Sequence, residues 1–135
     1  MSDQIVVNCI AGESLASAQF KFVYVDGSDS EKVKVVGTAG AVATVLGVLL
    51  NNPADDGVAY VCVSGICDVL AGAAVEPFDY LTSTNAGLAT PATTSGHYVL
   101  GRALPMLEGS SAPDAASGDR IRIELFANKL VVIPA

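Results

Sequence analysis

Short segments in which apolar and polar residues alternate, separated by clusters of glycine, asparagine, aspartate or proline, run through most of this chain. Gln19–Val25 and Lys32–Val36 alternate on either side of the polar segment Asp26–Glu31, and Arg120–Leu125 places aliphatic residues on one face and charged residues on the other. Because successive side chains of a strand point to opposite faces, this pattern predicts half-buried strands and a hairpin over residues 19–36. Helical periodicity is nearly absent.

The remaining apolar segments are also short and are bounded by turn residues. We expect further strands at Val58–Val63, Ile66–Leu70, Asp79–Thr82, Tyr98–Leu104 and Lys129–Ile133. Their content of β-branched and aromatic residues favours strands, and short strands at such spacing are typical of sandwiches and barrels. The sequence therefore predicts an all-β fold, a compact β-barrel or sandwich of short antiparallel strands.

A weak internal repeat links two parts of the chain. Leu46–Leu50 has a glycine at its second position, and a loop closed by a glycine turn then leads to the strand expected at Val58–Val63. Leu100–Leu104 has a glycine at the same position, and a longer loop, which includes Glu108–Ala116, leads to Arg120–Leu125. A glycine inside a strand indicates a bulge or the close approach of another backbone. We therefore expect one of these features at both positions.

Composition and charge narrow the range of partners. Hydrophobic residues make up 51% of the 135 residues, and fourteen acidic residues against seven basic ones give a net charge of −7. Because such a chain repels phosphate groups, we expect no binding to nucleic acid or to an anionic membrane. The first residues lack the basic and apolar regions of a signal peptide, which indicates synthesis in the cytosol. The uncharged stretch 35–54 fails as a membrane span because glycine, asparagine and proline interrupt it.

Few side chains suit catalysis or metal binding. His97 is the single histidine, no Gly-x-Ser-x-Gly motif is present, and Cys9, Cys62 and Cys67 do not have zinc-ligand spacing. We expect buried reduced thiols, with a disulfide between Cys62 and Cys67 as the alternative. The acidic segment Asp26–Glu31 does not keep the residue order of an EF-hand, so we expect a solvated hairpin tip. The chain is therefore predicted to be no enzyme and to hold no metal or cofactor.

Two apolar segments near the ends of the chain are candidates for contact with a partner. They contain Ile5, Val6 and Val7 on one side and Leu130, Val131, Val132 and Ile133 on the other. Each segment is either a strand of the chain's own sheet or an edge that pairs with a neighbouring chain. The Glu108–Ala116 loop is a third candidate.

From residue 19 onwards, the order of glycines and small apolar residues resembles that of the small capsid cement, or head decoration, proteins of tailed bacteriophages. The motifs are Leu-Gly-Val-Leu at 46–49, Ala-Gly-Ala-Ala-Val at 71–75, Asp-Tyr-Leu at 79–81, Leu-Gly-Arg-Ala-Leu at 100–104 and Gly-Asp at 118–119. Because the first eighteen residues fall outside this pattern, we expect an N-terminal arm over residues 1–18 and a single β-domain over residues 19–135.

The resemblance implies a structural virion protein that lies on the outer surface of a phage capsid, binds the major capsid protein and forms a homotrimer. Such a protein is made in the host cytoplasm and stabilises the shell through many repeated contacts. One alternative is a head-fibre or adhesin-like binding module that recognises host surface glycans, against which the lack of tryptophan counts. Another is a small hydrolase that uses Cys62 or Cys67 with His97.

Overall fold

A computed structural model describes residues 4–28, 32–37, 45–93, 98–105, 118–125 and 131–132 of the chain. The main sheet contains β1 (Ile5–Ile10), β2 (Phe22–Asp26), β3 (Lys32–Val35), β4 (Val45–Leu49), β5 (Val58–Leu70), β6 (Tyr80–Ser83), β7 (Ala89–Pro91), β9 (Gly101–Ala103) and β10 (Arg120–Leu125). A separate two-stranded sheet contains β8 (Tyr98–Val99) and β11 (Val131–Val132).

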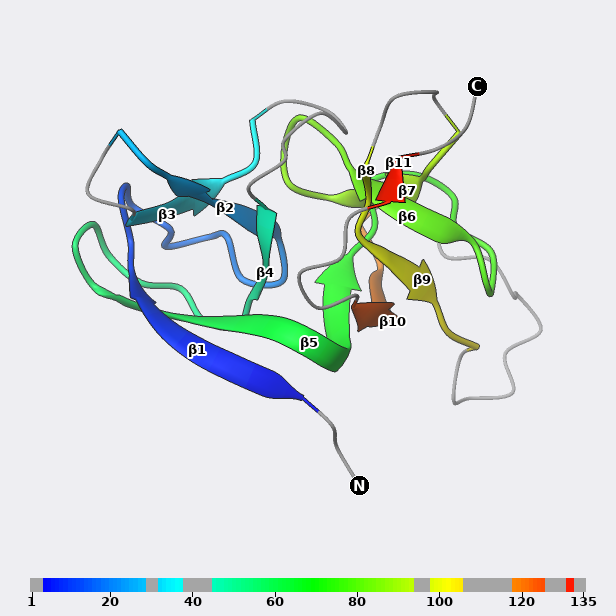
Figure 1. Ribbon diagram of the computed structural model, residues 1–135, viewed down its shortest axis with the longest axis horizontal. Coiled ribbons are helices and arrows are strands. Elements are labelled where there is room, and N and C mark those ends of the chain that lie inside the picture. The colour runs from blue at the N-terminus through cyan, green and yellow to red at the C-terminus, as the bar shows by residue number, and fades with distance from the viewer. Residues whose placement is uncertain are drawn as a thin grey trace.

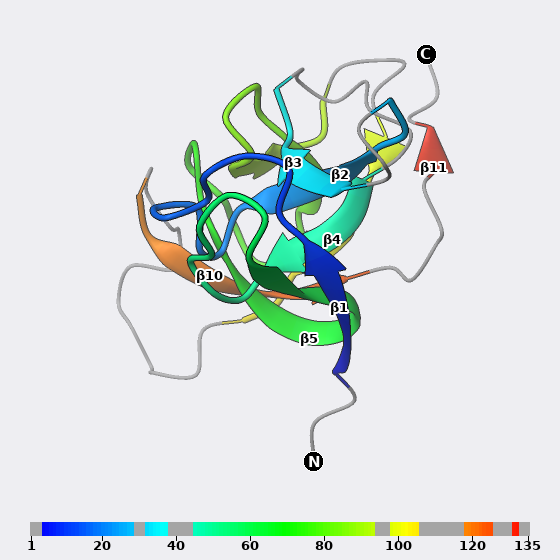
Figure 2. The same cartoon turned by 90° about the vertical axis from the view of Figure 1, so that its left-hand side faces the viewer.

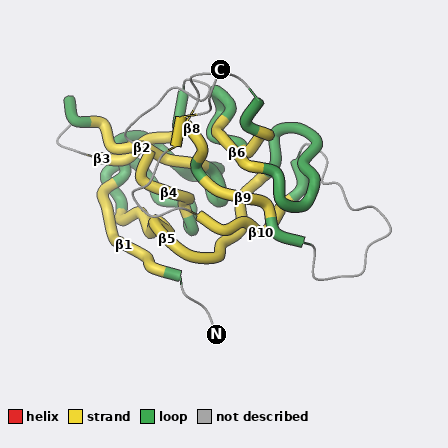
Figure 3. The backbone as a smooth tube through the Cα atoms, turned by 45° about the vertical axis from the view of Figure 1, so that its right-hand side comes forward, coloured by secondary structure: helices red, strands yellow, loops and turns green. Residues whose placement is uncertain are grey.

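The main sheet is antiparallel and curled (Figure 1). Its strands follow the order β3-β2-β4-β5-β10-β9-β6-β7, and β1 pairs with β5 beside this path. The described residues form strands, turns and loops without a helix (Figure 3). The predicted all-β fold is confirmed, as are the predicted hairpin, formed by β2 and β3, and the predicted strand Arg120–Leu125.

β5 is one strand of 13 residues, whereas the sequence predicted two, Val58–Val63 and Ile66–Leu70. Gly65 lies between the two predicted segments and has a φ of 99°, which glycine adopts without steric cost. The chain therefore changes direction there without ending the strand, as the bend of β5 in Figure 1 shows. β1 pairs with the first half of β5 and β10 pairs with the second half.

The predicted internal repeat is present and extends well beyond the segments that indicated it. Repeat 1, residues 5–63, contains β1 to β4 and the first half of β5, and repeat 2, residues 65–125, contains the second half of β5 with β6, β7, β9 and β10. The order β3-β2-β4-β5 from one end of the sheet matches the order β7-β6-β9-β10 from the other. Repeat 1 occupies the left half of Figure 1 and repeat 2 the right half.

Individual residues repeat as well as strands. Phe20 and Phe78, which each lie two residues before a strand, have φ values of 70° and 69°. The N–H of Phe20 donates to the carbonyl of Leu49 at 2.7 Å, and the N–H of Phe78 donates to the carbonyl of Ala103 at 2.8 Å. Because the same strained backbone recurs and is hydrogen-bonded to equivalent strands, β4 and β9, the two halves are copies of one structural unit.

The two glycines of the sequence repeat occupy the same place in the two copies. Gly47 on β4 lies against Cys62 on β5, where a Cβ would overlap the carbonyl oxygen of that cysteine. Gly101 on β9 lies against Glu124 on β10, where a Cβ would be 2.6 Å from the carbonyl oxygen. The predicted close approach of a second backbone is confirmed at both positions.

Each repeat has a hydrophobic core made of equivalent residues. The core of repeat 1 contains Ala11, Leu15, Val23, Val33, Leu49, Ala59 and Val61. The core of repeat 2 contains Ala71, Val75, Leu81, Ala89, Ala103, Ile121 and Ile123. Because Ala11 and Leu15 belong to the segment predicted as an N-terminal arm, the described part of that arm is integrated into repeat 1, as the strand β1 and as core residues.

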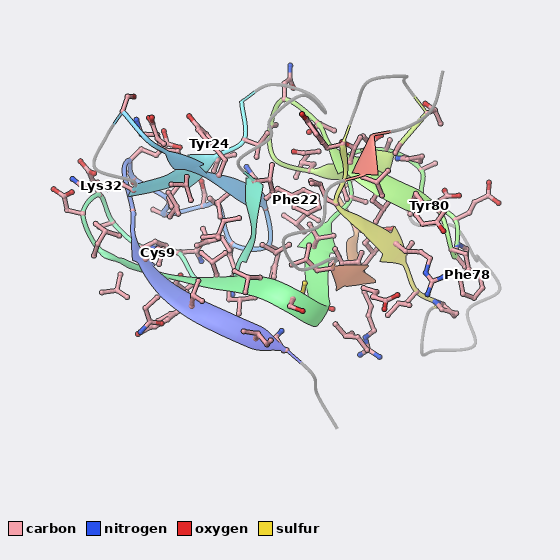
Figure 4. The ribbon with its side chains drawn as sticks, viewed as in Figure 1. Cys9, Phe22, Tyr24, Lys32, Phe78 and Tyr80 are labelled. Atoms are coloured by element: carbon pink, nitrogen blue, oxygen red, sulfur yellow. The ribbon has the colours of Figure 1, made fainter. Side chains whose placement is uncertain are left out.

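The core of repeat 2 also covers one face of repeat 1. Phe22, Val48 and Cys62 lie opposite one another on β2, β4 and β5, and all three are fully buried in the core of repeat 2. Figure 4 shows Phe22 in the middle of the molecule. This row of three residues is called the outer row of repeat 1, because it lies on the face of the sheet opposite to the repeat's own core.

The outer row of repeat 2 faces solvent instead. It consists of Tyr80, Arg102 and Glu124, which lie opposite one another on β6, β9 and β10. Tyr80 is 55% exposed, Arg102 donates to Glu124 at 2.9 Å, and the Arg102 guanidinium lies 5.8 Å from the centre of the Phe78 ring. Equivalent positions of the two repeats are therefore interior in one and surface in the other.

Candidate interaction surface

Apolar side chains remain exposed on the part of repeat 1 that repeat 2 does not cover. Val6 and Ile10 on β1 and Val58 and Tyr60 on β5 are 41%, 43%, 47% and 44% exposed. Val6, Asn8 and Ile10 are spaced two residues apart and therefore lie on the same face of β1. Asn8 lies opposite Tyr60 and Ile10 lies opposite Val58, so the four apolar side chains share one face of the two strands. These four residues are called the apolar face. Figure 2 shows the two strands side by side.

The strands that carry the apolar face are free of charge. The segments Gln4–Gly12 and Gly57–Cys67 contain no acidic or basic residue, in a chain with 21 of them. Charged residues are depleted from the centres of protein interfaces, and contiguous exposed apolar patches mark interaction sites. The composition of this surface is therefore that of a contact surface.

Repeat 2 shows that the fold itself does not require apolar side chains at these positions. Val58 and Arg120 are the first residues of equivalent strands, so Arg120 and Arg122 stand where repeat 1 has Val58 and Tyr60. Arg120 lies 3.5 Å from the carboxylate of Asp68. The outer face of this strand pair therefore mixes charged residues with the apolar Ile66 and Leu70 in repeat 2, whereas in repeat 1 it carries no charge.

The predicted N-terminal contact residues differ in their exposure. Ile5 and Val6 are 55% and 41% exposed, whereas Val7 points inward and packs against the core of repeat 1. Val58 and Tyr60 were not among the contact residues predicted from the sequence. A signal for them was present, because the strand that contains them carries uncharged residues on both faces, unlike the strand Arg120–Leu125.

The C-terminal candidates are described only in part. Val131 and Val132 form β11, which pairs antiparallel with β8 of the same chain, in agreement with the first of the two predicted alternatives. Leu130, Ile133 and the Glu108–Ala116 loop lie outside the described residues.

All three cysteines are free thiols. Cys62 and Cys67 are buried and hydrogen-bonded to each other; this bond lowers the pKa of Cys62 to about 7, and the same bond, together with burial, raises the pKa of Cys67. Burial also raises the pKa of Cys9. His97, the base of the hydrolase alternative, lies outside the described residues. Among the residues that the structure describes, no three metal-ligating side chains form a cluster.

The fold defines a class of protein: an all-β chain built from two copies of a β-repeat that share one curled sheet. It is similar to the solved structure of the head fiber gp8.5 N base of bacteriophage phi29, with a TM-score of 0.63 and 14% sequence identity over 95% of this chain and 98% of that chain. At this identity the similarity concerns the fold. No family model and no curated protein matches the chain. Within the described ranges, no helix is both long and apolar enough to cross a membrane.

Proposed function

We propose that the chain is a structural protein of a bacteriophage head that decorates the capsid and binds the major capsid protein through the apolar face. The observation that carries this proposal is the exposed, uncharged apolar face, in which Val58 and Tyr60 stand where repeat 2 has Arg120 and Arg122. The fold similarity to a phage head fibre base, over nearly the whole of both chains, supports a place on a phage head.

The apolar face is suited to a contact that is weak in one copy and strong in many. Its four side chains are a little under half exposed, so covering each of them gains about 1 kcal/mol. Much of that gain is offset by the cost of association. A capsid presents the same binding site many times, and repeated contacts over a lattice stabilise a shell even when each contact is modest.

The fold similarity also favours a second candidate, a fibre-associated module on a phage head, which the sequence analysis gave as a head-fibre or adhesin-like module that binds host glycans. This candidate predicts that the isolated chain binds sugars on a glycan array. Binding to capsids without binding to glycans would favour decoration, and the reverse result would favour the second candidate.

The internal repeat supplies the variant that tests the proposal. Val58→Arg combined with Tyr60→Arg gives repeat 1 the residues that repeat 2 carries in Arg120 and Arg122. Because these are surface changes, we expect the free energy of unfolding to stay within about 0.5 kcal/mol of its original value. Co-sedimentation with capsids assembled from the major capsid protein of the same genome should weaken at least tenfold, which is about 1.4 kcal/mol.

The matched control changes the equivalent positions of repeat 2, as Arg120→Gln with Arg122→Gln, and should leave capsid binding unchanged. Capsid binding that stays the same in the folded Val58→Arg, Tyr60→Arg variant would show that the apolar face is not the contact. Failure of the unaltered chain to sediment with the capsids would contradict the proposed function itself.

A further inference from the structure

Three strands of the main sheet pair with only one other strand, namely β1, β3 and β7. An edge strand exposes backbone N–H and C=O groups that can pair with another chain, and proteins block this with lysine, proline or very short strands. β3 carries Lys32 and Lys34, and β7 has three residues and ends at Pro91. β1 has six residues with neither charge nor proline. Among the residues that the structure describes, β1 is the one strand of these three without such protection. Ala11, directly after β1, bridges Val33 of β3, so the edge is closed at that end and open towards Ile5.

The backbone of β1 offers its hydrogen-bonding groups to this edge. On β5, the N–H of Tyr60 donates to Asn51 Oδ1 at 3.0 Å, and the carbonyl of Tyr60 accepts from the N–H of Leu50 at 2.8 Å. Tyr60 therefore has no backbone group left for Asn8, which lies opposite it on β1. Because hydrogen-bonded and non-hydrogen-bonded pairs alternate in an antiparallel ladder, the N–H and C=O of Asn8 point away from β5 and towards the open edge.

We propose that this edge pairs with β1 of a second copy of the chain, antiparallel about a twofold axis, so that the main sheet continues from one copy into the other. A strand that pairs antiparallel with its own copy forms a self-complementary contact, in which both copies use the same residues. The pairing adds backbone hydrogen bonds along the open part of β1.

The charge of the chain favours a second copy meeting at this strand. Two copies each carry a net charge of −7 and repel one another at close range. β1 and the half of β5 beside it contain no charged residue, so this edge lets two copies approach with the least repulsion. The pairing also joins the two apolar faces into one surface on the same side of the sheet.

This twofold pair departs from the homotrimer that the resemblance implies, and it does not depend on the proposed function. The test therefore uses the isolated chain, without capsids, in sedimentation velocity over a series of concentrations. We expect the mass of two copies, with dissociation to one copy on dilution. A mass of one copy throughout, or of three, would overturn the proposal.

Asn8→Pro is the variant that acts on the edge. Proline removes the N–H that points to the open edge and leaves the hydrogen bonds to β5 in place. We expect its dissociation constant for the pair to rise at least tenfold, while the matched variant Asn8→Thr, which keeps the N–H, pairs like the unaltered chain. An Asn8→Pro protein that folds and still pairs equally well would refute the role of this edge.

Hydrogen exchange provides a measurement that needs no variant, should Asn8→Pro fail to fold. In the pair, the Asn8 amide is hydrogen-bonded across the contact, so its exchange should slow as the protein concentration rises, whereas the amides that bond to β5 should change little. Exchange at Asn8 that is independent of concentration would contradict the proposal. A single-copy mass combined with capsid binding that Asn8→Pro abolishes would instead assign the edge to a strand of the capsid protein.

Discussion

The two repeats build the same core but differ on their outer faces. Seven equivalent pairs of residues fill the two cores, yet the outer row of repeat 1 is apolar and buried while that of repeat 2 contains the Arg102–Glu124 ion pair and faces solvent. Strand position is the same in both. The difference therefore comes from coverage, because the core of repeat 2 packs on the outer face of repeat 1 and nothing described covers repeat 2 in return.

This difference in coverage helps to explain the composition of the apolar face. Val48 and Cys62 belong to the part of the outer face of repeat 1 that is already an interface inside the molecule. Val58 and Tyr60 continue the same face of the same sheet beyond the edge of repeat 2 and are equally uncharged. Repeat 2 places arginines there, so the apolar composition of repeat 1 is explained by a contact and not by the fold.

The largest expected effect comes from moving a charge between the two outer rows. Val48→Arg gives repeat 1 the residue that repeat 2 has at position 102 and places an unpaired charge in a fully buried site. We expect the free energy of unfolding to fall by at least about 3 kcal/mol, measured by urea denaturation. The reverse change, Arg102→Val, should alter it by less than about 1 kcal/mol, because the two side chains of the ion pair that it removes are 38% and 45% exposed. Equal costs would refute the difference in coverage.

The two repeated glycines should show a smaller difference. Gly47→Ala forces a Cβ onto the Cys62 carbonyl in a buried strand, and Gly101→Ala brings one to 2.6 Å from the Glu124 carbonyl oxygen. We expect losses of about 3 kcal/mol and about 1–2 kcal/mol in thermal unfolding, within the range for overpacked sites. Gly27→Ala, with nothing within 4 Å of its Cβ, is the control and should change little. A larger loss at Gly101 than at Gly47 would contradict this order.

The sequence predicted most clearly those strands that have one solvent-exposed face and one packed face. Arg120–Leu125 and Lys32–Val35 alternate clearly, because their charged side chains lie on the face that solvent reaches. β5 was predicted as two strands because Ser64 and Gly65 read as a turn, whereas pairing with β1 and β10 carries the ladder through the glycine. Propensity at two residues was overridden by the strands on either side.

The apolar face could not be predicted in the same way. Val48 and Val58 are the same residue type and both project from the outer face of repeat 1, yet one is fully buried and the other is 47% exposed. Their difference depends on where repeat 2 lies, which local pattern does not encode. The repeat itself was recognised through its two strand glycines, which a neighbouring backbone constrains in both copies, and through the loop and the alternating strand that follow each of them.

The smallest expected effect concerns the equivalent turns that follow β2 and β6. Asp26 Oδ1 accepts hydrogen bonds from the Ser28 hydroxyl at 2.7 Å and the Ser28 N–H at 3.0 Å, and Thr84 Oγ1 accepts one from the Ala86 N–H at 3.2 Å. The bonds from Ser28, together with Lys34, lower the pKa of Asp26 to about 2. The equivalent acceptor in repeat 2 carries no charge and does not titrate.

Because the pKa of Asp26 in the folded chain lies below the ordinary value of 3.8 for an aspartate, the ionised carboxylate stabilises the fold at pH values above about 4, and this stabilisation is lost as the pH falls towards 2. Asp26→Thr gives repeat 1 the residue of repeat 2 and should remove this part of the acid dependence. Melting temperatures of both proteins between pH 5 and pH 2 should converge as the pH falls. Curves that stay parallel through this range would show that the turn of repeat 1 is no more sensitive to pH than that of repeat 2.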